Sequence, residues 1–501
     1  MTFRMMVRVV SLLSCGAALA VFVSCDRDYG LPPGPDDYNT VEIISYSRHV
    51  QPIFARRCAT SGCHDTQSAE EDLIMDSWES VMRGSENGAM VVPFRPEKSH
   101  LIFHVNTDTT VAPVAEPRMP PDAPLAKDEV AFLMRWIREG AKNDLGQVPF
   151  FDVRSGKILV TNQADDEVAI IDVESNMLMR MVSVGSLDNR TTPPEAPHNL
   201  AVDPQLQSYY VNMIVSNEIL KYRARDNVLL GKLNLGEKAS PAQIALSRDG
   251  TTGYVTNFDI TGTNRSIQVF NTQTMEVTRR ISDQRMIAPH GITRSRSGET
   301  LWIACQQSDN IGIVDMRDPD EVTIVKVDST VPDIPIGAPR FGPYQLVFTP
   351  DGRFAYVTCR FSNDVRVFDT QTTRLVSVIP VGVNPLILQI SPDGSLLYVA
   401  NRGTGAAPSR TVSVVDTRTN REFRKIQNVG AEPHGVAVSS SGRFVYVACE
   451  NVGSPDEPHH PVKGLNTPGI VAVIDINRNF EVIKRIEVGA FAAGIVFFPT
   501  P

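Results

Sequence analysis

The 501-residue chain lacks an excess of positive charge, a convincing disulfide framework and an apolar run long enough to span a membrane. Its formal net charge of -9 argues against nucleic acid as a partner, because phosphate binding requires a basic face. Of its seven cysteines, Cys15 and Cys25 lie in the N-terminal signal pattern, Cys58 and Cys63 are close together and the last three are scattered, so no disulfide framework is expected. The apolar run from Val9 to Ser24 is short for a transmembrane helix.

The composition that remains is that of a globular protein, with 42% hydrophobic and 21% charged residues. A chain of 501 residues is too long for one ordinary core, so we expect two or more domains. The motifs below place a small domain before a large one.

The N-terminus has the pattern of an export signal. Arg4 and Arg8 supply positive charge, and an apolar run follows them. The run ends at Phe22-Val23-Ser24-Cys25, which resembles a bacterial lipobox, so residues 1–24 are interpreted as a signal and Cys25 as the lipidated N-terminus. Leu12-Leu13-Ser14-Cys15 is a competing lipobox, and an uncleaved anchor helix is the remaining alternative. Each alternative predicts an exported protein, periplasmic or on the cell surface, that is attached to a membrane.

The strongest chemical motif is Cys58-Ala-Thr-Ser-Gly-Cys63-His64. Covalent attachment of haem requires two thiols for its vinyl groups and an adjacent histidine for the iron, usually spaced C-x-x-C-H. Here four residues separate the cysteines, and a bulged loop accommodates this if both sulfurs keep their positions. A disulfide or half of a zinc site is the alternative, but no second Cys/His pair lies nearby. We therefore predict one haem c on Cys58 and Cys63, with His64 as an iron ligand.

Two helices are expected around this motif, at residues 45–57 and 127–142, because their apolar residues have helical spacing. Between them, Arg118-Met119-Pro120-Pro121 presents a methionine on a loop that two prolines stiffen. A haem iron held by histidine commonly takes a methionine thioether on its other side, which raises its reduction potential. We predict Met119 as this ligand, with Met90 and Met134 as competitors.

The segments Val50 to Cys58, Val92 to Ile102, Met119 to Pro121 and Trp136 to Ala141 resemble class I cytochrome c domains of planctomycete-type and related bacterial proteins. The resemblance implies a cytochrome c domain at residues 41–143, preceded by a Pro/Gly-rich tether at residues 25–40. It also implies a six-coordinate, low-spin haem with His64 and Met119 as axial ligands. His49, His100 and His104 stay open as alternatives on the distal side.

The rest of the chain repeats a four-strand pattern. A strand reading Tyr-Val-Thr-Asn, or a close variant, starts at residues 159, 209, 254, 301, 356, 398 and 446. Alternating runs broken by Asp-Gly, Asn and Pro turns complete each unit. Seven units predict a seven-bladed β-propeller at residues 155–501. The first unit begins at its second strand near Lys157 and residues 493–498 form an orphan first strand, so these two ends should share one blade.

These repeats resemble the YVTN family of propellers, a resemblance that is specific for fold and weak for function. The predicted fold class is a small all-α cytochrome c domain followed by an all-β seven-bladed propeller. Cys305, Cys359 and Cys449 occupy equivalent strand positions and are expected to be small buried core residues.

The starts of the seven first strands should form a ring around one mouth of the central channel. These positions are His198, Ala242, His290, Tyr344, Leu386, His434 and Ala493. Further candidates near this mouth are Arg340, Arg360, Arg402 and His459-His460. In one interpretation the histidines belong to turn and packing positions of the repeat. In the other, His198, His290 and His434 converge on a second haem or a metal ion, because imidazole ligates copper, zinc and haem iron.

Three functions fit these patterns. The favoured one is electron transfer through haem c to a redox partner protein, with the propeller as a binding platform and no catalytic residue assigned. The alternative is a periplasmic oxidoreductase whose propeller carries a second haem or a His-ligated metal. The third is a scaffold for protein or carbohydrate that uses the haem as a redox sensor.

Overall fold

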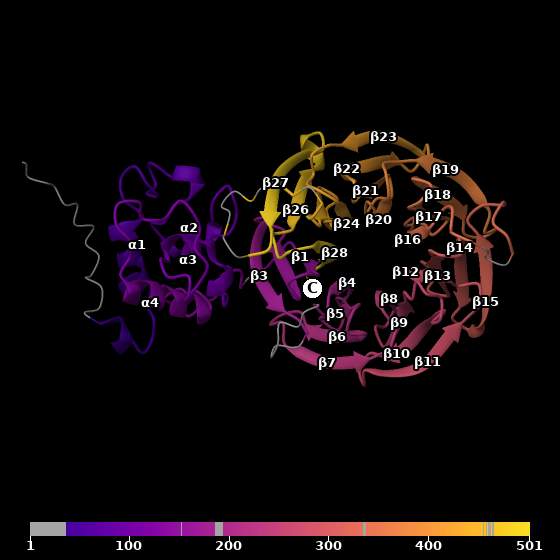
Figure 1. Ribbon diagram of the computed structural model, residues 1–501, viewed down its shortest axis with the longest axis horizontal. Helices are drawn as coiled ribbons and strands as arrows, with labels where there is room; N and C mark the ends of the chain where they lie inside the picture. Colours follow the sequence, from indigo (N-terminus) through magenta and orange to yellow (C-terminus); the bar gives the residue numbers. More distant parts are fainter. Residues whose placement is uncertain are drawn as a thin grey trace, which may run out of the picture.

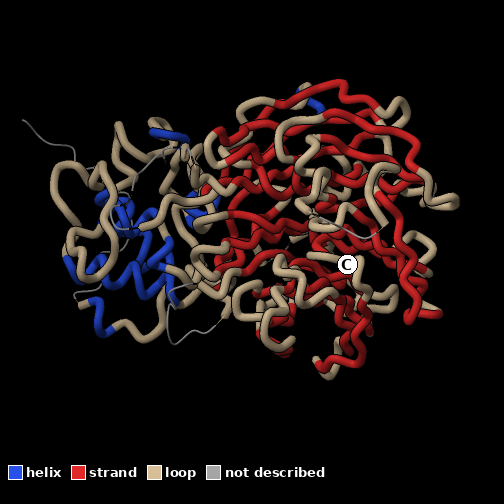
Figure 2. Tube along the Cα trace, turned by 45° about the vertical axis from the view of Figure 1, so that its right-hand side comes forward, coloured by secondary structure: helices blue, strands red, loops and turns tan. Residues whose placement is uncertain are grey.

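The computed structural model describes residues 37–151, 153–185, 194–333, 337–453, 455–456, 458, 462 and 465–500. Helices gather on one side of the molecule and strands form a ring on the other (Figures 1 and 2). The predicted signal, the Cys25 lipidation site, the competing Cys15 and the His459-His460 pair lie outside the described residues. Within the described part, no helix is both long enough and apolar enough to cross a membrane.

The N-terminal region contains a few short helices joined by loops. Its α-helices are α1 (Gln51–Arg57), α2 (Trp78–Arg83), α3 (His100–Val105) and α4 (Lys127–Arg138). The helix expected at residues 45–57 is present, but it starts as a π-helix at Tyr46–Val50 and continues as α1. The helix expected to reach Lys142 ends at Arg138, because Gly140 and Ala141 take positive φ angles of 106° and 53°.

This region has its own hydrophobic core. Trp136 of α4 lies edge-on to Phe54 of α1, with 6.2 Å between ring centroids, and also contacts Tyr46. The competitor Met134 is buried in the same core, whereas Met90 packs against it and is half-buried. The aromatic contacts between α1 and α4 therefore fix the segment that leads into Cys58.

The remaining chain forms seven four-stranded antiparallel sheets, as the repeats predict. From the inner to the outer strand, blade 1 is β28 (Ala492–Phe498), β1 (Lys157–Asn162), β2 (Glu167–Asp172) and β3 (Met177–Ser183). Blade 2 is β4 (Pro197–Asp203), β5 (Ser208–Met213), β6 (Glu218–Arg223) and β7 (Leu229–Asn234). Blade 3 is β8 (Pro241–Leu246), β9 (Thr252–Asn257), β10 (Ser266–Asn271) and β11 (Glu276–Ser282).

The other four blades follow the same order. Blade 4 is β12 (Pro289–Arg294), β13 (Thr300–Cys305), β14 (Asn310–Asp315) and β15 (Asp318–Lys326). Blade 5 is β16 (Pro343–Phe348), β17 (Phe354–Cys359), β18 (Asp364–Asp369) and β19 (Leu375–Pro380). Blade 6 is β20 (Pro385–Ile390), β21 (Leu396–Thr404), β22 (Ala407–Asp416) and β23 (Arg421–Ile426). Blade 7 is β24 (Pro433–Val438), β25 (Phe444–Cys449), β26 (Ile470–Asp475) and β27 (Glu481–Glu487).

The two ends of the propeller chain share blade 1, as the orphan strand predicts. Lys157 of β1 pairs with Phe498 of β28, and Asn162 pairs with Ala492. This pairing closes the ring seen in Figure 1 and leaves no free inner edge between the first and last repeats.

A separate apolar cluster fills the space between each pair of neighbouring blades. The second strand of each blade contributes side chains to two of these clusters, because successive side chains of a strand point to opposite faces of the sheet. Cys305, Cys359 and Cys449 each end a second strand, are fully buried in these clusters and are free thiols. They are core residues, as expected.

The N-terminal region packs against the rim of the ring, beside β3 and β27 of blades 1 and 7 (Figure 1). Arg95 donates to Glu167 at 2.6 Å and to the Met181 carbonyl at 3.1 Å. Lys98 lies 3.0 Å from the same Glu167 and 3.3 Å from Asp165. Glu167 is only 3% exposed, so these ion pairs are largely shielded from water and screened little by salt.

Candidate functional site

The segment after α1 folds back on itself to bring Cys58 and His64 together. The His64 backbone N–H donates to the Cys58 carbonyl at 3.2 Å, and the Cys63 N–H donates to the Thr60 carbonyl at 3.0 Å. Gly62, with φ of 82°, supplies the left-handed residue of this turn. The two extra residues of the motif are thus absorbed by a local turn.

The residues present fit a covalently bound haem. Cys58 and Cys63 are both free thiols, and burial raises the pKa of Cys58 to about 12. The Nδ1 atom of His64 is buried and has no hydrogen-bond partner among the described residues. No hydrogen bond at Nδ1 therefore fixes the orientation of this ring. Two free thiols followed directly by a histidine are the groups that attachment of haem c requires at this position.

The Met119 loop is held against α3. The Met119 N–H donates to the His104 carbonyl at 2.9 Å, and the Ala115 N–H donates to the Phe103 carbonyl at 2.9 Å. The His104 side chain adds a contact of 2.7 Å between its Nδ1 and the Pro117 carbonyl. Met119 itself is half-buried. The loop that carries this candidate ligand is thus fixed at three points on one helix.

The three histidines considered as alternative distal ligands each make contacts of their own in the structure. His49 accepts the Ser45 N–H at 3.0 Å through Nδ1, next to the start of the first helix. His104 is engaged with the Met119 loop. His100 points toward Glu487 of β27, with 3.7 Å between Nε2 and Oε2. His100 is therefore oriented to the propeller.

The seven inner strands begin at equivalent positions around one mouth of the channel, and the second residue of each strand forms the predicted ring. Pro197 pairs with Met213 in blade 2, and Pro289 with Cys305 in blade 4. In ring order the second residues are His434, Ala493, His198, Ala242, His290, Tyr344 and Leu386. An alanine stands between successive histidines, so the three imidazoles can reach one another across the small side chains.

Hydroxyl groups of the repeated strand hold the backbone of these positions. Thr161 donates to the His198 carbonyl at 3.1 Å, and Thr256 donates to the His290 carbonyl at 2.7 Å. The glycine after His290 is required by close packing, since a Cβ at Gly291 would lie 2.6 Å from the Tyr344 carbonyl. The His-Gly pairs thus have a packing role, as one interpretation of the sequence holds.

The side chains of His198 and His290 form a hydrogen-bonded chain. Their Nε2 atoms are 3.2 Å apart. The Nδ1 of His290 lies 3.1 Å from the Tyr344 carbonyl, so it must carry a proton, and His290 Nε2 is then an acceptor. His198 Nε2 therefore donates, and its Nδ1 accepts from the Gln163 amide at 2.8 Å. The contacts assign one tautomer to each ring, and both rings are neutral.

The third histidine belongs to an ionic group. His434 Nδ1 lies 2.7 Å from Glu450 Oε1, and the ring of His434 lies edge-on to His198 at 5.9 Å. Arg402 donates through Nε to the same Glu450 oxygen at 2.7 Å. Glu450 is 1% exposed. We call His198, His290 and His434, with Glu450, the mouth cluster.

Burial and charge set the protonation of the mouth cluster. Burial lowers the pKa of His198 to about 3, and burial also holds the pKa of His290 well below its usual value. Hydrogen bonds from His434 and Arg402 outweigh the desolvation of Glu450 and lower its pKa to about 2. At neutral pH, Glu450 is a carboxylate and the His198–His290 pair carries no charge.

Sequence reasoning placed the three histidines at this mouth but missed Glu450 and Gln163. Both directly follow a second strand, as Arg360 does in blade 5, whereas Arg402 lies within the longer second strand of blade 6. That repeat position was the signal that could have identified them. Within the described residues, no three His, Cys, Asp or Glu side chains are arranged to hold a metal ion. In the mouth cluster, His198 and His290 bond each other, and His434 bonds Glu450.

The candidate haem segment and the mouth cluster occupy different parts of the molecule. The N-terminal region lies at the rim of the ring, and α1 lies on the side of that region away from the propeller (Figure 1). The two sites therefore do not form one continuous pocket.

Comparison with family models agrees with this division. The model described as Planctomycete cytochrome C matches residues 61–123, and the model described as Lactonase, 7-bladed beta-propeller, matches residues 320–454. The first match implies a haem c cofactor in the N-terminal region.

Individual relatives match only part of the chain. A 6-phosphogluconolactonase of Enterobacter sp. (strain 638) is 22% identical over 280 residues, which cover 50% of this chain and 76% of that protein. Antigen Lp49 of Leptospira interrogans is 24% identical over 176 residues, 32% of this chain and 36% of that protein. A solved structure of a functionally unknown protein from Desulfotomaculum acetoxidans covers 69% of this chain and 100% of its own, with a TM-score of 0.51 and 14% identity. That likeness shows the fold alone.

Proposed function

We propose that this protein is an exported, lipid-anchored cytochrome c that transfers single electrons, and that its propeller is a binding platform. The observation that carries the proposal is the Cys58–His64 turn, with two free thiols and an adjacent histidine, of which Cys63 and His64 lie inside the segment 61–123 that matches a cytochrome c family. The iron of a haem c bound here supplies reversible one-electron chemistry. Cys58 and Cys63 would hold the haem covalently, and His64 and Met119 would ligate its iron.

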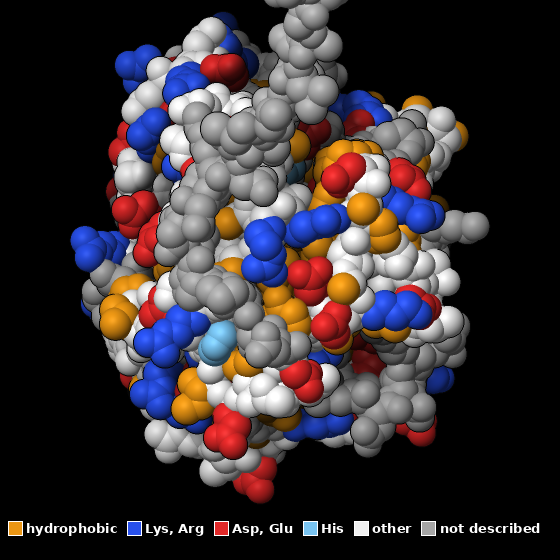
Figure 3. Space-filling view, turned by 90° about the vertical axis from the view of Figure 1, so that its left-hand side faces the viewer, with side chains coloured by type: hydrophobic (Ala, Val, Ile, Leu, Met, Phe, Trp, Pro, Cys, Tyr) orange, Lys and Arg blue, Asp and Glu red, His pale blue; other side chains and the backbone are white. Residues whose placement is uncertain are grey.

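The exposed face of the N-terminal region is suited to a protein partner. Hydrophobic, acidic and basic side chains are mixed on this face, and none of the three kinds forms a continuous field where described atoms are visible (Figure 3). Because α1 lies on the side away from the propeller, a redox partner reaches the haem segment without displacing the ring. Anchoring through Cys25 would keep both domains at a membrane surface outside the cytoplasm.

The decisive experiment tests covalent haem attachment. Wild-type protein, expressed with haem-lyase machinery, should keep its haem in acidified acetone and give a c-type pyridine haemochrome spectrum. Cys58→Ala and Cys63→Ala should each yield extractable haem or a protein that does not mature. Cys305→Ala is the matched control, because that thiol is a buried core residue of blade 4. Fully covalent haem in both single variants would exclude these thiols as the attachment points.

A second candidate function is an oxidoreductase whose reaction site is the mouth cluster. The specific observation in its favour is the His434–Glu450 contact beside two neutral imidazoles, since a histidine oriented by a carboxylate is a typical proton acceptor. The similarity to a 6-phosphogluconolactonase supports an enzymatic propeller in general terms. Elemental analysis and an optical spectrum separate the candidates: a second chromophore or stoichiometric copper or zinc supports an enzyme with a propeller cofactor, and haem iron alone excludes it.

A further inference from the structure

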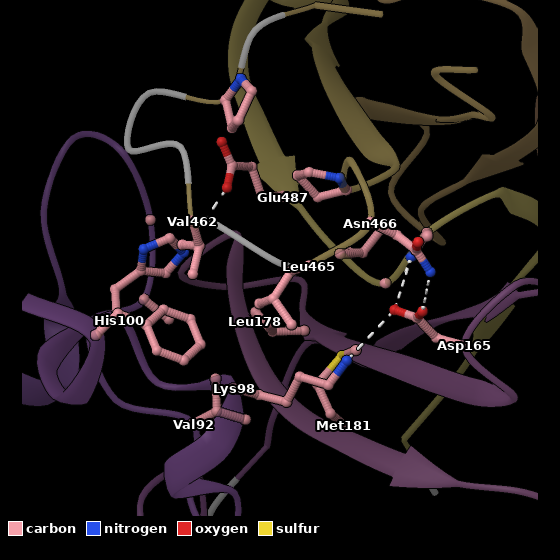
Figure 4. Close-up of a pocket in the computed structure, with 18 of the residues that line it drawn as sticks. Val92, Lys98, His100, Asp165, Leu178, Met181, Val462, Leu465, Asn466 and Glu487 are labelled. Carbon is pink, nitrogen blue, oxygen red and sulfur yellow. Dashed lines mark hydrogen bonds and ion pairs between the residues drawn. The ribbon is translucent and has the colours of Figure 1, made fainter. Parts of the chain in front are cut away.

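A cavity of about 470 Å³ lies between the N-terminal region and blades 1 and 7 (Figure 4). Cavities of this size at domain interfaces are common sites for small molecules. Its walls come from three parts of the chain that are distant in sequence: residues 87–113, the first blade, and residues 458, 462 and 465–490. The cavity therefore exists only when the two domains are docked.

Polar groups stand at two separate places in the wall. At one, His100 of α3 faces Glu487 of β27. At the other, Lys98 lies 3.3 Å from Asp165, which also accepts from Asn466 at 3.3 Å. Figure 4 shows these two groups on opposite sides of the labelled apolar residues. A ligand thus meets donors and acceptors at both ends.

Apolar side chains line the space between these ends. Leu178 and Met181 of β3 and Val92 of the N-terminal region belong to one buried cluster, and Leu465 covers the cavity from the loop before β26. A molecule with a flat apolar body and one hydroxyl at each end matches this distribution, because its body replaces water next to apolar walls and its hydroxyls pair with the polar groups.

We propose that this interdomain cavity binds a small two-ended aromatic alcohol of the quinol class. One hydroxyl pairs with the His100–Glu487 group and the other with the Lys98–Asp165 group. The ring lies between Leu178 and Leu465. Nothing in this proposal depends on the iron ligands.

A ligand bound in the cavity is expected to affect the Met119 loop through α3. Phe103, on the same helix as His100, lines the cavity, and its carbonyl accepts the Ala115 N–H. The next carbonyl, that of His104, accepts the Met119 N–H. A ligand that shifts α3 therefore shifts the Met119 loop. This second step rests on the proposed function, since it requires Met119 to ligate iron.

The first test is calorimetric titration of the intact holoprotein with 1,5-dihydroxynaphthalene as probe and 1-naphthol as the single-hydroxyl comparison. We expect one saturable site, with the diol bound roughly fivefold tighter than the mono-ol, because one hydrogen-bonded end is lost. Absence of saturable diol binding, or equal affinity for both probes, overturns the proposal.

Variants then locate the site. Leu465→Trp should weaken binding at least tenfold by narrowing the cavity, and at 42% exposure this position tolerates a larger side chain. Leu229→Trp on β7, where the leucine is 50% exposed, is the matched control and should bind as wild type. His100→Ala should reduce diol affinity to that of 1-naphthol. Unchanged binding in Leu465→Trp contradicts the location.

The haem spectrum tests the coupling of the cavity to the Met119 loop separately from ligand binding itself. Saturating diol should change the near-infrared charge-transfer band expected of His–Met ligation in wild type and not in Leu465→Trp. Saturable binding with no change in the band contradicts the coupling through α3. The calorimetric signal does not require Met119 to ligate iron, so diol binding can be measured even if the proposed haem function is wrong. Conversely, a failure to bind the diol does not contradict the haem assignment.

Discussion

The Nε2 atoms of His198 and His290 lie 3.2 Å apart, although blade 3 separates the two blades that carry these residues. The contact exists because Ala242, the equivalent residue of blade 3, is too small to keep the rings apart. His290 is 1% exposed and His198 is 8% exposed. The two rings are therefore buried and neutral, and the folded state disfavours their protonation.

This relationship predicts a pH-dependent loss of stability. The folded-state pKa of His198 is about 3, below its unfolded value of 6.5, so the unfolded chain takes up a proton first as pH falls. Stability should be intact above pH 6.5 and decline below it, by about 2 kcal/mol between pH 7 and pH 5 from this residue. His198→Gln should show a smaller decline in urea titrations followed by far-ultraviolet circular dichroism, which reports the β-strands of the propeller. A variant profile as steep as that of the wild type would contradict the assigned cause.

Glu450 is predicted to stabilise blades 6 and 7 as a charged group. Its carboxylate receives Arg402 and His434 in an almost fully buried position. Glu450→Gln leaves Arg402 with one carboxylate, that of Glu432 at 3.5 Å, and should cost about 3 kcal/mol of unfolding free energy at pH 7. Urea denaturation measures this cost. Asp416→Asn, whose partner Arg418 is mostly exposed, is the control and should cost little.

Met119→Ala is predicted to abolish the near-infrared charge-transfer band and to lower the reduction potential, because the thioether ligand stabilises ferrous iron. Covalent haem should be retained, since Cys58 and Cys63 are untouched. Met90→Ala is the control, because Met90 packs against the core of the same region. A spectrum that changes in the Met90 variant and not in the Met119 variant would move the distal ligand to Met90.

Arg95 is predicted to hold the two domains together. Its side chain is 14% exposed and bonds Glu167 and the Met181 carbonyl across the interface. Arg95→Gln should raise the rate of tryptic cleavage at Lys142 or Arg154, which flank the connection to β1, by roughly tenfold. Arg225→Gln removes an exposed ion pair with Asp226 in blade 2 and should leave the rate unchanged. Equal rates in wild type and Arg95→Gln would mean that the ion pairs do not limit domain opening.

The sequence alone determined the propeller and the candidate haem segment, because both depend on short-range or periodic patterns. Seven copies of the Tyr-Val-Thr-Asn strand fix the blade number, and the orphan strand at the C-terminus fixes closure. The C-x₄-C-H spacing predicts haem attachment without any long-range information. The repeat also predicts where each inner strand begins, so the sequence alone predicted His198, His290 and His434 at one mouth of the channel.

Only the tertiary structure decided how these parts meet. The contact between His198 and His290 depends on side-chain directions across three blades, and the Tyr344 carbonyl and Gln163 amide assign the tautomers with which these two rings bond each other. The docking of the N-terminal region at the rim depends on Arg95 and Lys98 reaching a glutamate that is distant in sequence, Glu167. Contacts of this kind arise from surfaces that exist only after each domain has folded, so no local pattern in the chain encodes them.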